Sequence, residues 1–269
     1  MLITSDINGL QGLKDGALNS GANRLGGIKL FADGTFGSST AYMLSPFSDD
    51  PSKHGMLIHP PEELYRRMAA AHNAGWQVCI HAIGDASNKL CVDLYSRLFK
   101  EYPRQGSRHR IEHASIMDEK TMGELSRLGI IVSTQPMFIH SEKDWLRRRL
   151  GGERCQTVYP FRSFLDAGIK MAGASDAPVE SPDVLHAIQC CVTREGFEPH
   201  QGISVEEAVR MYTLDAAYAQ FEDGMKGSIT PGKRADLVVL SDDPFKGKPD
   251  KIKDIKVVRT VVGGKVVYN

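Results

Sequence analysis

The sequence of 269 residues has little of what would reveal a partner at once. It has no surplus of either charge, because 33 Lys and Arg residues balance 33 Asp and Glu residues, so nothing favours binding to nucleic acid or an anionic membrane. No apolar run approaches the length needed to cross a bilayer. The first residues, MLITSDINGL, lack the basic and apolar segments of a secretory signal peptide. These absences exclude nucleic acid and membranes as expected partners.

Cysteine is also scarce and irregularly placed. The five cysteines are Cys79, Cys91, Cys155, Cys190 and Cys191. Their number is odd and no two have the C-x-x-C spacing, so the pattern predicts neither a disulfide framework nor a thiolate zinc site. A reducing compartment fits such a sequence best, and we expect a cytoplasmic protein.

Short apolar segments alternate with helical patterns through most of the chain. Strands are predicted at 28–31, 77–81, 110–113, 130–134 and 169–174, with helices at 61–74, 86–102, 118–128 and 161–167 and an irregular charged insertion at 137–158. The predicted strands are apolar on both faces, which is typical of a parallel sheet covered by helices.

The last 45 residues have a different character. After the turn-rich segment 227–233, β patterns follow at 235–240 and 255–262, and Gly263-Gly264 predicts a hairpin into Lys265–Tyr268. We therefore expect two domains, an α/β body at 1–224 and a small antiparallel module at 225–269.

One strand carries a lysine where an apolar residue would be expected. In GIKLFADGTFGSSTA, residues 27–41, Lys29 lies inside an apolar segment that ends in a Gly- and Ser-rich loop. Two interpretations are open. Its amine is solvated at a barely covered face, or it is a neutral amine that does chemistry as a Schiff base or as a carbamate.

Four predicted strands have a metal-capable residue at or near the C-terminal end. These residues are Lys29, His81, His113 and Asp176. In a parallel α/β barrel that end is the catalytic face. Imidazoles and carboxylates are ligands for zinc or a similar divalent ion, which lowers the pKa of bound water. Asp176 is the candidate general base.

The other histidines differ in their expected relation to this site. His109 and His113 are four residues apart, which on a strand is ~13 Å, so we do not expect them to share a metal. His140 follows Gln135-Pro136, and we expect it to contact substrate. The remaining histidines are interpreted as solvated.

Several segments together resemble a known family. GIKLFADGTFGSSTA, VCIHAIGD, RIEHAS, GASDAP, GSITPGKRADLVVL and VVGGKVV are similar to segments of the amidohydrolase superfamily. The nearest branch is the one often labelled amidohydrolase 3, which includes N-substituted formamide deformylases. The resemblance implies a metal-bearing (β/α)8 barrel with a small β-sandwich.

The resemblance also implies roles for individual residues. Lys29 would be carboxylated by carbon dioxide and bridge two metals, His81 and His113 would ligate the second metal, and Asp176 would be both ligand and general base. The expected cofactor is a divalent metal, zinc, as one or two ions. Asp85, in HAIGD, is a candidate substrate contact.

One departure from the family pattern affects the prediction of function. None of the nine histidines forms the H-x-H pair of the family's first barrel strand. We therefore expect only about strands 4–8 of the barrel and the C-terminal part of the sandwich, with unpaired sheet edges at the 28–31 and 169–174 strands. The partners expected are a small-molecule substrate and either a second copy of the chain or a missing N-terminal half.

Two functions from different classes follow. One is a metal-dependent hydrolase of amide-type C–N bonds, with a deaminase as the alternative chemistry, incomplete in this chain. The other is a non-catalytic or regulatory remnant of the same fold.

Overall fold

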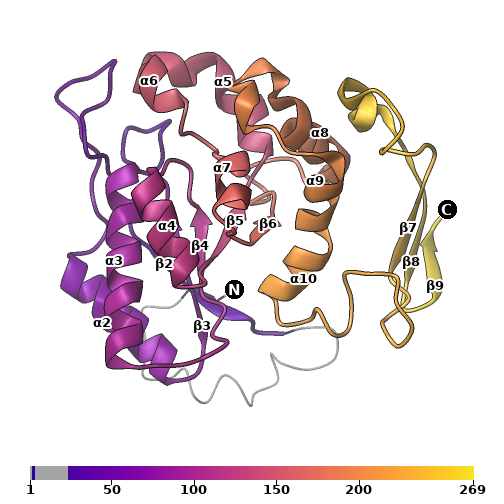
Figure 1. Ribbon diagram of the computed structural model, residues 1–269, viewed down its shortest axis with the longest axis horizontal. Helices are drawn as coiled ribbons and strands as arrows, with labels where there is room; N and C mark the ends of the chain where they lie inside the picture. Colours follow the sequence, from indigo (N-terminus) through magenta and orange to yellow (C-terminus); the bar gives the residue numbers. More distant parts are fainter. Residues whose placement is uncertain (1, 4–23) are drawn as a thin grey trace. The chain divides into compact units, whose positions relative to one another are not determined.

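The computed structural model describes residues 2–3 and 24–269, arranged as two compact units (Figure 1). Unit 1 comprises residues 1–132, 148–158 and 167–169, and unit 2 comprises residues 133–147, 159–166 and 170–269. Each unit has its own packing and is described separately below.

Unit 1 is built on parallel strands. β1 (Leu2–Ile3), β2 (Gly27–Phe31), β3 (Gln77–Ala82) and β4 (Arg110–His113) pair in this order, each parallel to the next. Two further strands are β5 (Ile131–Thr134), which begins in unit 1, and β6 (Met171–Gly173), which belongs to unit 2. β2 and β3 are almost wholly buried, as their continuous apolar sequences predict. The predicted α/β class with a parallel sheet is confirmed.

The prediction of an unpaired edge at the 28–31 strand is wrong. The backbone of Leu2 pairs with Ile28 and that of Ile3 with Lys29, so β2 has a neighbour on each side. Two residues are too few to give a period-2 pattern, and for this reason the sequence contained no signal for β1.

Among the described residues of unit 1, helices α2 (Pro61–Asn73) and α3 (Asp85–Glu101) pack on the sheet and α4 (Glu119–Arg127) packs on α3. α2 packs on β2 and β3, α3 packs on β3, and α3 contacts both α2 and α4 (Figure 1). The N-terminal ends of α2 and α4 carry residues that favour the start of a helix. α2 begins with Pro61 and acidic residues in its first turn, and the Asp118 carboxylate accepts from the Thr121 N–H at 2.8 Å to cap α4.

The segment predicted as an irregular insertion is helical. α5 (Met137–Leu150) and α6 (Gly152–Cys155) occupy most of it. The reason is visible in the spacing of Ile139, Leu146 and Leu150, which are all buried and recur on one face of a helix. The charged residues between them, including Arg147 and Arg148, lie on the exposed side and hide this period in a simple reading of polarity.

Unit 2 is mainly helical around β6. Its helices include α7 (Phe161–Asp166), α8 (Val184–Thr193), α9 (Val205–Tyr212) and α10 (Leu214–Ala219). The short 3-10 turns η2 (Arg194–Gly196) and η3 (Pro199–Gln201) connect α8 to α9. α9 and α10 pack on β6, and α8 packs on α9. Ser204 and Glu207 form a reciprocal capping box at the start of α9. No helix in the described part of the chain is long and apolar enough to cross a bilayer.

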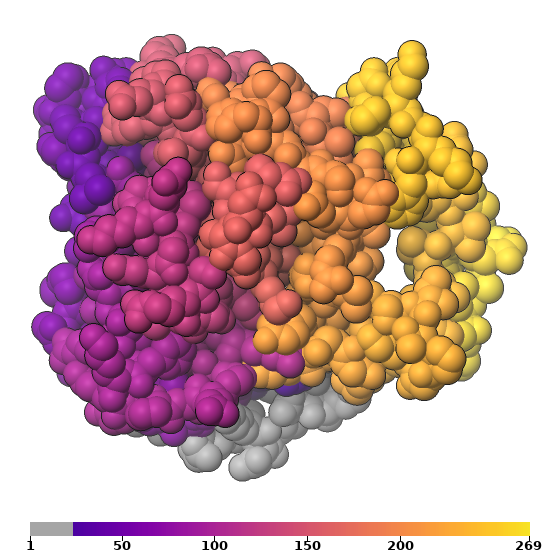
Figure 2. Space-filling model, viewed as in Figure 1, coloured from indigo at the N-terminus to yellow at the C-terminus, as the bar shows by residue number. Residues whose placement is uncertain are grey.

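The C-terminal residues form a separate antiparallel sheet, drawn in yellow in Figures 1 and 2. It consists of β7 (Leu237–Leu240), β8 (Val257–Val262) and β9 (Lys265–Tyr268), close to the predicted bounds. Between β7 and β8, η4 (Pro249–Asp254) packs on α8, where Ile252 is buried and the Lys253 N–H donates to Gln189 Oε1 at 3.1 Å. That this sheet belongs to a sandwich stays a prediction.

Candidate metal centre

Three of the predicted metal ligands lie in unit 1 on neighbouring strands. Lys29 is in β2, His81 near the end of β3 and His113 is the last residue of β4. All three side chains are buried, and the His81 and His113 rings are 4.4 Å apart between centroids. Since parallel strands bring their C-terminal ends to one edge, the chain order itself places these groups together.

His81 is a neutral imidazole whose Nε2 is engaged by acceptors of the protein. Its Nε2 lies 2.9 Å from the Gly34 carbonyl oxygen and 3.5 Å from Asp33 Oδ1. Both neighbours are acceptors, so Nε2 carries the hydrogen and the lone pair is on Nδ1. Burial lowers the pKa of His81 to about 4, partly offset by the bond to Gly34. A neutral ring oriented by a carbonyl is how proteins prepare a histidine to bind a metal.

His113 reaches His81 by breaking the alternation of its strand. The register pairs His81 with Glu112 and Ala82 with His113, so strict alternation would turn the His113 side chain to the opposite face. Instead, His113 has a φ of 76°. This left-handed conformation is uncommon for a residue other than glycine and is often found where a functional side chain is positioned.

Lys29 is buried close to these rings. It is 7% exposed, so its side chain is not spread into solvent as one of the two interpretations required. Its Nζ lies 5.2 Å from the centre of the Phe31 ring, which is 5.5 Å from the His81 ring. The positive charge of Lys29 contributes to the lowered pKa of His81, which places the two groups in one electrostatic environment.

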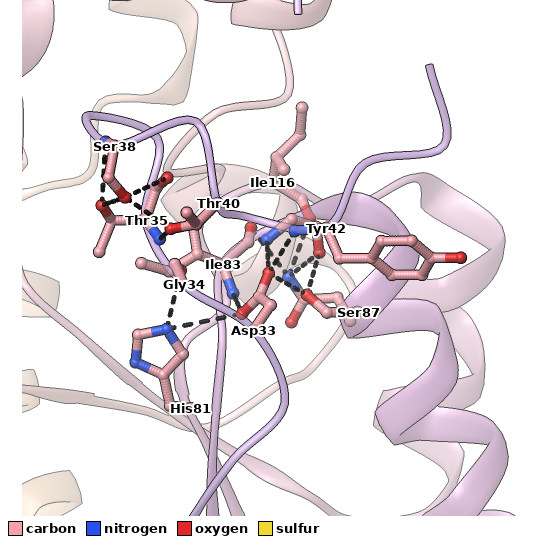
Figure 3. A network of polar contacts seen from close by, with 12 residues as sticks. Asp33, Gly34, Thr35, Ser38, Thr40, Tyr42, His81, Ile83, Ser87 and Ile116 are labelled. Carbon is pink, nitrogen blue, oxygen red and sulfur yellow. Dashed lines mark hydrogen bonds and ion pairs between the residues drawn. The ribbon is translucent and has the colours of Figure 1, made fainter. Parts of the chain in front are cut away.

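Sequence reasoning missed Asp33, which organises the loops around His81 (Figure 3). Its Oδ2 accepts from the Tyr42 N–H and the Gly84 N–H, both at 2.9 Å, and from the Ser87 hydroxyl at 2.6 Å. Its Oδ1 accepts from the Ile83 N–H at 3.0 Å. Burial raises the pKa of Asp33 to about 6, and these hydrogen bonds oppose that shift. The one local signal was an acid directly after an apolar strand and before a glycine.

Asp176 lies in unit 2, in the loop that follows β6. It is exposed and has a φ of 57°, another left-handed residue after a strand end. Residues just before it line a cavity of about 270 Å³ together with Tyr212, whose buried hydroxyl has no hydrogen-bond partner among the described residues. The loop therefore borders a space that a small molecule would fit.

Known proteins are similar to this chain in sequence and fold. The model of a family described as Amidohydrolase family matches residues 5–268. The chain belongs to the amidohydrolase family. It is 34% identical over 251 residues to the putative amidohydrolase YtcJ of Bacillus subtilis (strain 168), covering 90% of this chain and 47% of that protein. It is 27% identical over 252 residues to the N-substituted formamide deformylase of Arthrobacter pascens, covering 91% and 46%.

Solved structures agree with this assignment. An uncharacterized metal-dependent hydrolase from Pyrococcus horikoshii OT3 superposes with a TM-score of 0.80 at 30% identity, over 90% of this chain and 50% of that one. This amidohydrolase chain thus spans about half the length of these relatives.

The two residues predicted to contact substrate are engaged within the amidohydrolase chain. Asp85 begins α3, and its Oδ1 accepts from the N–H groups of Leu44 and Ala86 at 2.8 and 2.9 Å. His140, on the first turn of α5, lies with its Nδ1 2.9 Å from a carboxylate oxygen of Glu195. These contacts give both side chains a partner in the protein itself.

His109 is not brought into the metal centre. Its Nδ1 accepts from the Val78 N–H at 3.0 Å, and its Nε2 lies 2.7 Å from His72 Nδ1. Because the first nitrogen is an acceptor, the second carries the hydrogen and donates to His72. This fits the expectation that His109 and His113 do not share a metal.

Proposed function

We propose that this chain is part of a metal-dependent hydrolase of amide-type C–N bonds. The observation that carries the proposal is the pair of buried imidazoles, His81 and His113, 4.4 Å apart at the ends of adjacent parallel strands. Membership of the amidohydrolase family supports the reaction class, and the similarity to a protein described as a metal-dependent hydrolase supports the cofactor.

The donors in unit 1 fit a divalent cation of the zinc class. We propose that His81 offers Nδ1, since its Nε2 donates to Gly34, and that His113 is the second imidazole ligand. Lys29 would become a third ligand if carbon dioxide converted its amine to a carbamate. The carbamate would offer anionic oxygens to the cation, whereas the protonated amine would repel it. When bound, such a cation lowers the pKa of water and polarises a carbonyl oxygen.

The remaining roles belong to residues of the chain. Asp176, as ligand and general base, would take a proton from the attacking water and pass it to the leaving nitrogen. Its exposed position beside the cavity at Tyr212 suits a group that must reach solvent and substrate. Asp33 would act as a positioning residue, because it fixes the loop whose Gly34 carbonyl orients His81.

The architecture of the whole protein follows from the same family. We propose that the parallel sheet is part of a (β/α)8 barrel, about strands 4–8, and that residues 225–269 are part of a β-sandwich domain distinct from the barrel portion at 1–224. We propose that a second copy of the chain or an N-terminal half supplies the remaining strands of the barrel and of the sandwich. A reducing, cytoplasmic location suits cysteines that are present as thiols rather than as disulfides.

Metal content tests the proposal most directly. The chain is stripped with chelator, reloaded with Zn²⁺ and assayed for bound metal as wild type, His81→Asn and His54→Asn. His54 is exposed and serves as the matched control. We expect His81→Asn to lower the affinity for metal at least tenfold and His54→Asn to leave it unchanged. Equal metal content in all three proteins would refute the proposed ligands.

Turnover is measured with N-substituted formamides and other simple amides. It is assayed on this chain and on the chain extended by any coding sequence in frame before Met1. Asp176→Asn should reduce turnover by about 10²-fold or more, since an amide cannot accept the proton. Activity close to wild type in that variant would remove Asp176 from the mechanism.

A second function is favoured by one observation. The sequence has no H-x-H pair, so a non-catalytic or regulatory protein of the same fold is the alternative. Metal bound at His81 and His113 without turnover of any amide by the extended chain would favour this alternative.

A further inference from the structure

A second group of metal-capable side chains lies in unit 2, made of residues other than the metal ligands proposed above. His140 is on the first turn of α5, His186 on the first turn of α8, and Glu195 in η2. Glu195 Oε2 lies 2.9 Å from His140 Nδ1, and Oε1 lies 3.1 Å from His186 Nε2. The two imidazole rings are 4.7 Å apart between centroids. One ligand atom from each residue lies within 4.8 Å of the other two.

The turn that carries Glu195 is fixed by a buried arginine. Arg194 ends α8 in a left-handed conformation and is fully buried, with its guanidinium donating to the carbonyls of Tyr159 at 2.9 Å and Phe197 at 3.2 Å. Glu195 itself has a φ of 46°, a left-handed conformation inside η2. The carboxylate is thus held in place by the fold, apart from its contacts with the histidines.

The electrostatics keep the carboxylate ionised and ready to bind a cation. Burial opposes ionisation of Glu195, yet hydrogen bonds from His140 and His186 outweigh it and lower its pKa to about 2. Lys143 Nζ is 3.5 Å from Oε2, and the Cys190 thiol lies 3.9 Å from Oε1. The Glu195 carboxylate is therefore surrounded by groups that stabilise negative charge, and a bound cation would take over this task.

Distances and ligand types indicate the kind of ion. A tetrahedral ion with bonds of 2.0–2.1 Å separates its ligand atoms by about 3.3 Å. Measured from one carboxylate oxygen, Glu195 Oε1, His140 Nδ1 lies at 3.0 Å and His186 Nε2 at 3.1 Å, so these two separations need only small shifts to reach that value. Two imidazoles and one carboxylate suit zinc or another divalent transition ion better than calcium or magnesium, which prefer oxygen ligands.

We propose that His140, His186 and Glu195 form a binding site for a divalent ion of the zinc class, linking the start of α5 to α8 and η2. Three protein ligands leave a fourth position for water or a ligand. The His140 side chain is 47% exposed, which provides a path for the ion to enter. Lys143 competes for the same carboxylate, and removal of its charge should favour the ion.

The test uses the metal alone as probe, with the unit 1 ligands removed. The His81→Asn/His113→Asn double variant is stripped with chelator and titrated with Zn²⁺ by calorimetry and with Co²⁺ by its visible absorption. We expect about one equivalent to bind. Adding His186→Ala or Glu195→Gln should weaken this equivalent at least tenfold, whereas His200→Ala, an exposed histidine outside the group, should leave it unchanged.

A gain-of-affinity variant separates a metal site from a simple ion-pair network. Lys143→Met removes the competing ammonium, so it should tighten Zn²⁺ binding several-fold. The same measurements in the wild-type background keep the test valid if the double variant does not fold, because Glu195→Gln should then remove one equivalent from the total. Binding that is the same in Glu195→Gln, His186→Ala and Lys143→Met as in the parent protein would overturn the proposal.

Discussion

Replacing Asp33 by Asn tests how far one carboxylate organises the loops around His81. In the wild-type protein four donors converge on this side chain, three on Oδ2 and one on Oδ1 (Figure 3). Asn has a single acceptor oxygen. If that oxygen takes the place of Oδ2, the new NH2 group faces the Ile83 N–H, and two donors point at each other in a buried site.

The cost of this substitution follows from the bonds lost. An unsatisfied buried donor costs about 1–3 kcal/mol, and the three bonds that remain lose the charge assistance that roughly doubles their strength. Part of this cost is offset because the neutral Asn side chain no longer buries an ionised carboxylate. We therefore expect the free energy of unfolding to fall by about 2–4 kcal/mol, a large share of the 5–15 kcal/mol typical of a domain.

Urea unfolding at pH 7.5, above the Asp33 pKa of about 6, measures this effect. The fluorescence of Trp76, which is buried in unit 1, reports on this part of the molecule when Trp145 of unit 2 is replaced by Phe in every protein compared. Asp93→Asn is the matched control, because Asp93 is an exposed partner of Lys89 and its pair is worth only about 0.3–0.5 kcal/mol. A loss below 1 kcal/mol in Asp33→Asn would refute the view that this carboxylate holds the loops together.

Three other predictions rest on single contacts. Gly84→Ala should lower the stability of the protein in thermal melts by about 3 kcal/mol, because the new Cβ would lie 1.9 Å from the Tyr42 carbonyl oxygen. Gly123→Ala is the control: its Cβ would meet open space, so it should stabilise α4 by about 0.5–1 kcal/mol. Equal effects of the two substitutions would contradict the close packing at Gly84. Burial lowers the pKa of His109 to about 2, so the folded state binds fewer protons than the unfolded state below pH ~6.5. Stability should therefore fall by about 2 kcal/mol between pH 6.5 and 5, and a flat profile in urea titrations would exclude this. Arg194→Met should lower the free energy of unfolding by about 2–4 kcal/mol by leaving two carbonyls unsatisfied; a smaller loss than 1 kcal/mol would show that water replaces the guanidinium.

Local patterns predicted the sheet and the residues at its edge. β2 and β3 are short, mainly apolar segments followed by turns, and this pattern can be recognised in the sequence without knowledge of the neighbouring strands. His81 and His113 could be placed near each other because parallel strands share one edge. The two rings come together because His113 has a positive φ, and no feature of the sequence around His113 predicts this backbone conformation.

What the sequence did not reveal depends on contacts between distant segments. The donors to Asp33 come from positions 9 to 54 residues away, and His109 pairs with His72, 37 residues earlier. Neither arrangement leaves a periodic trace. The group at Glu195 was missed for the same reason, since two helix starts and a turn converge only after the chain has folded.

The cysteines give the protein its own probe of folding. All five thiols are fully buried, and burial raises the pKa of Cys79 and of Cys190 to about 12. A native chain near neutral pH therefore exposes almost no thiolate to an alkylating reagent, whereas an unfolded chain exposes five. Because Cys79 is in unit 1 and Cys190 in unit 2, the order in which mass spectrometry finds them labelled reports which unit opens first.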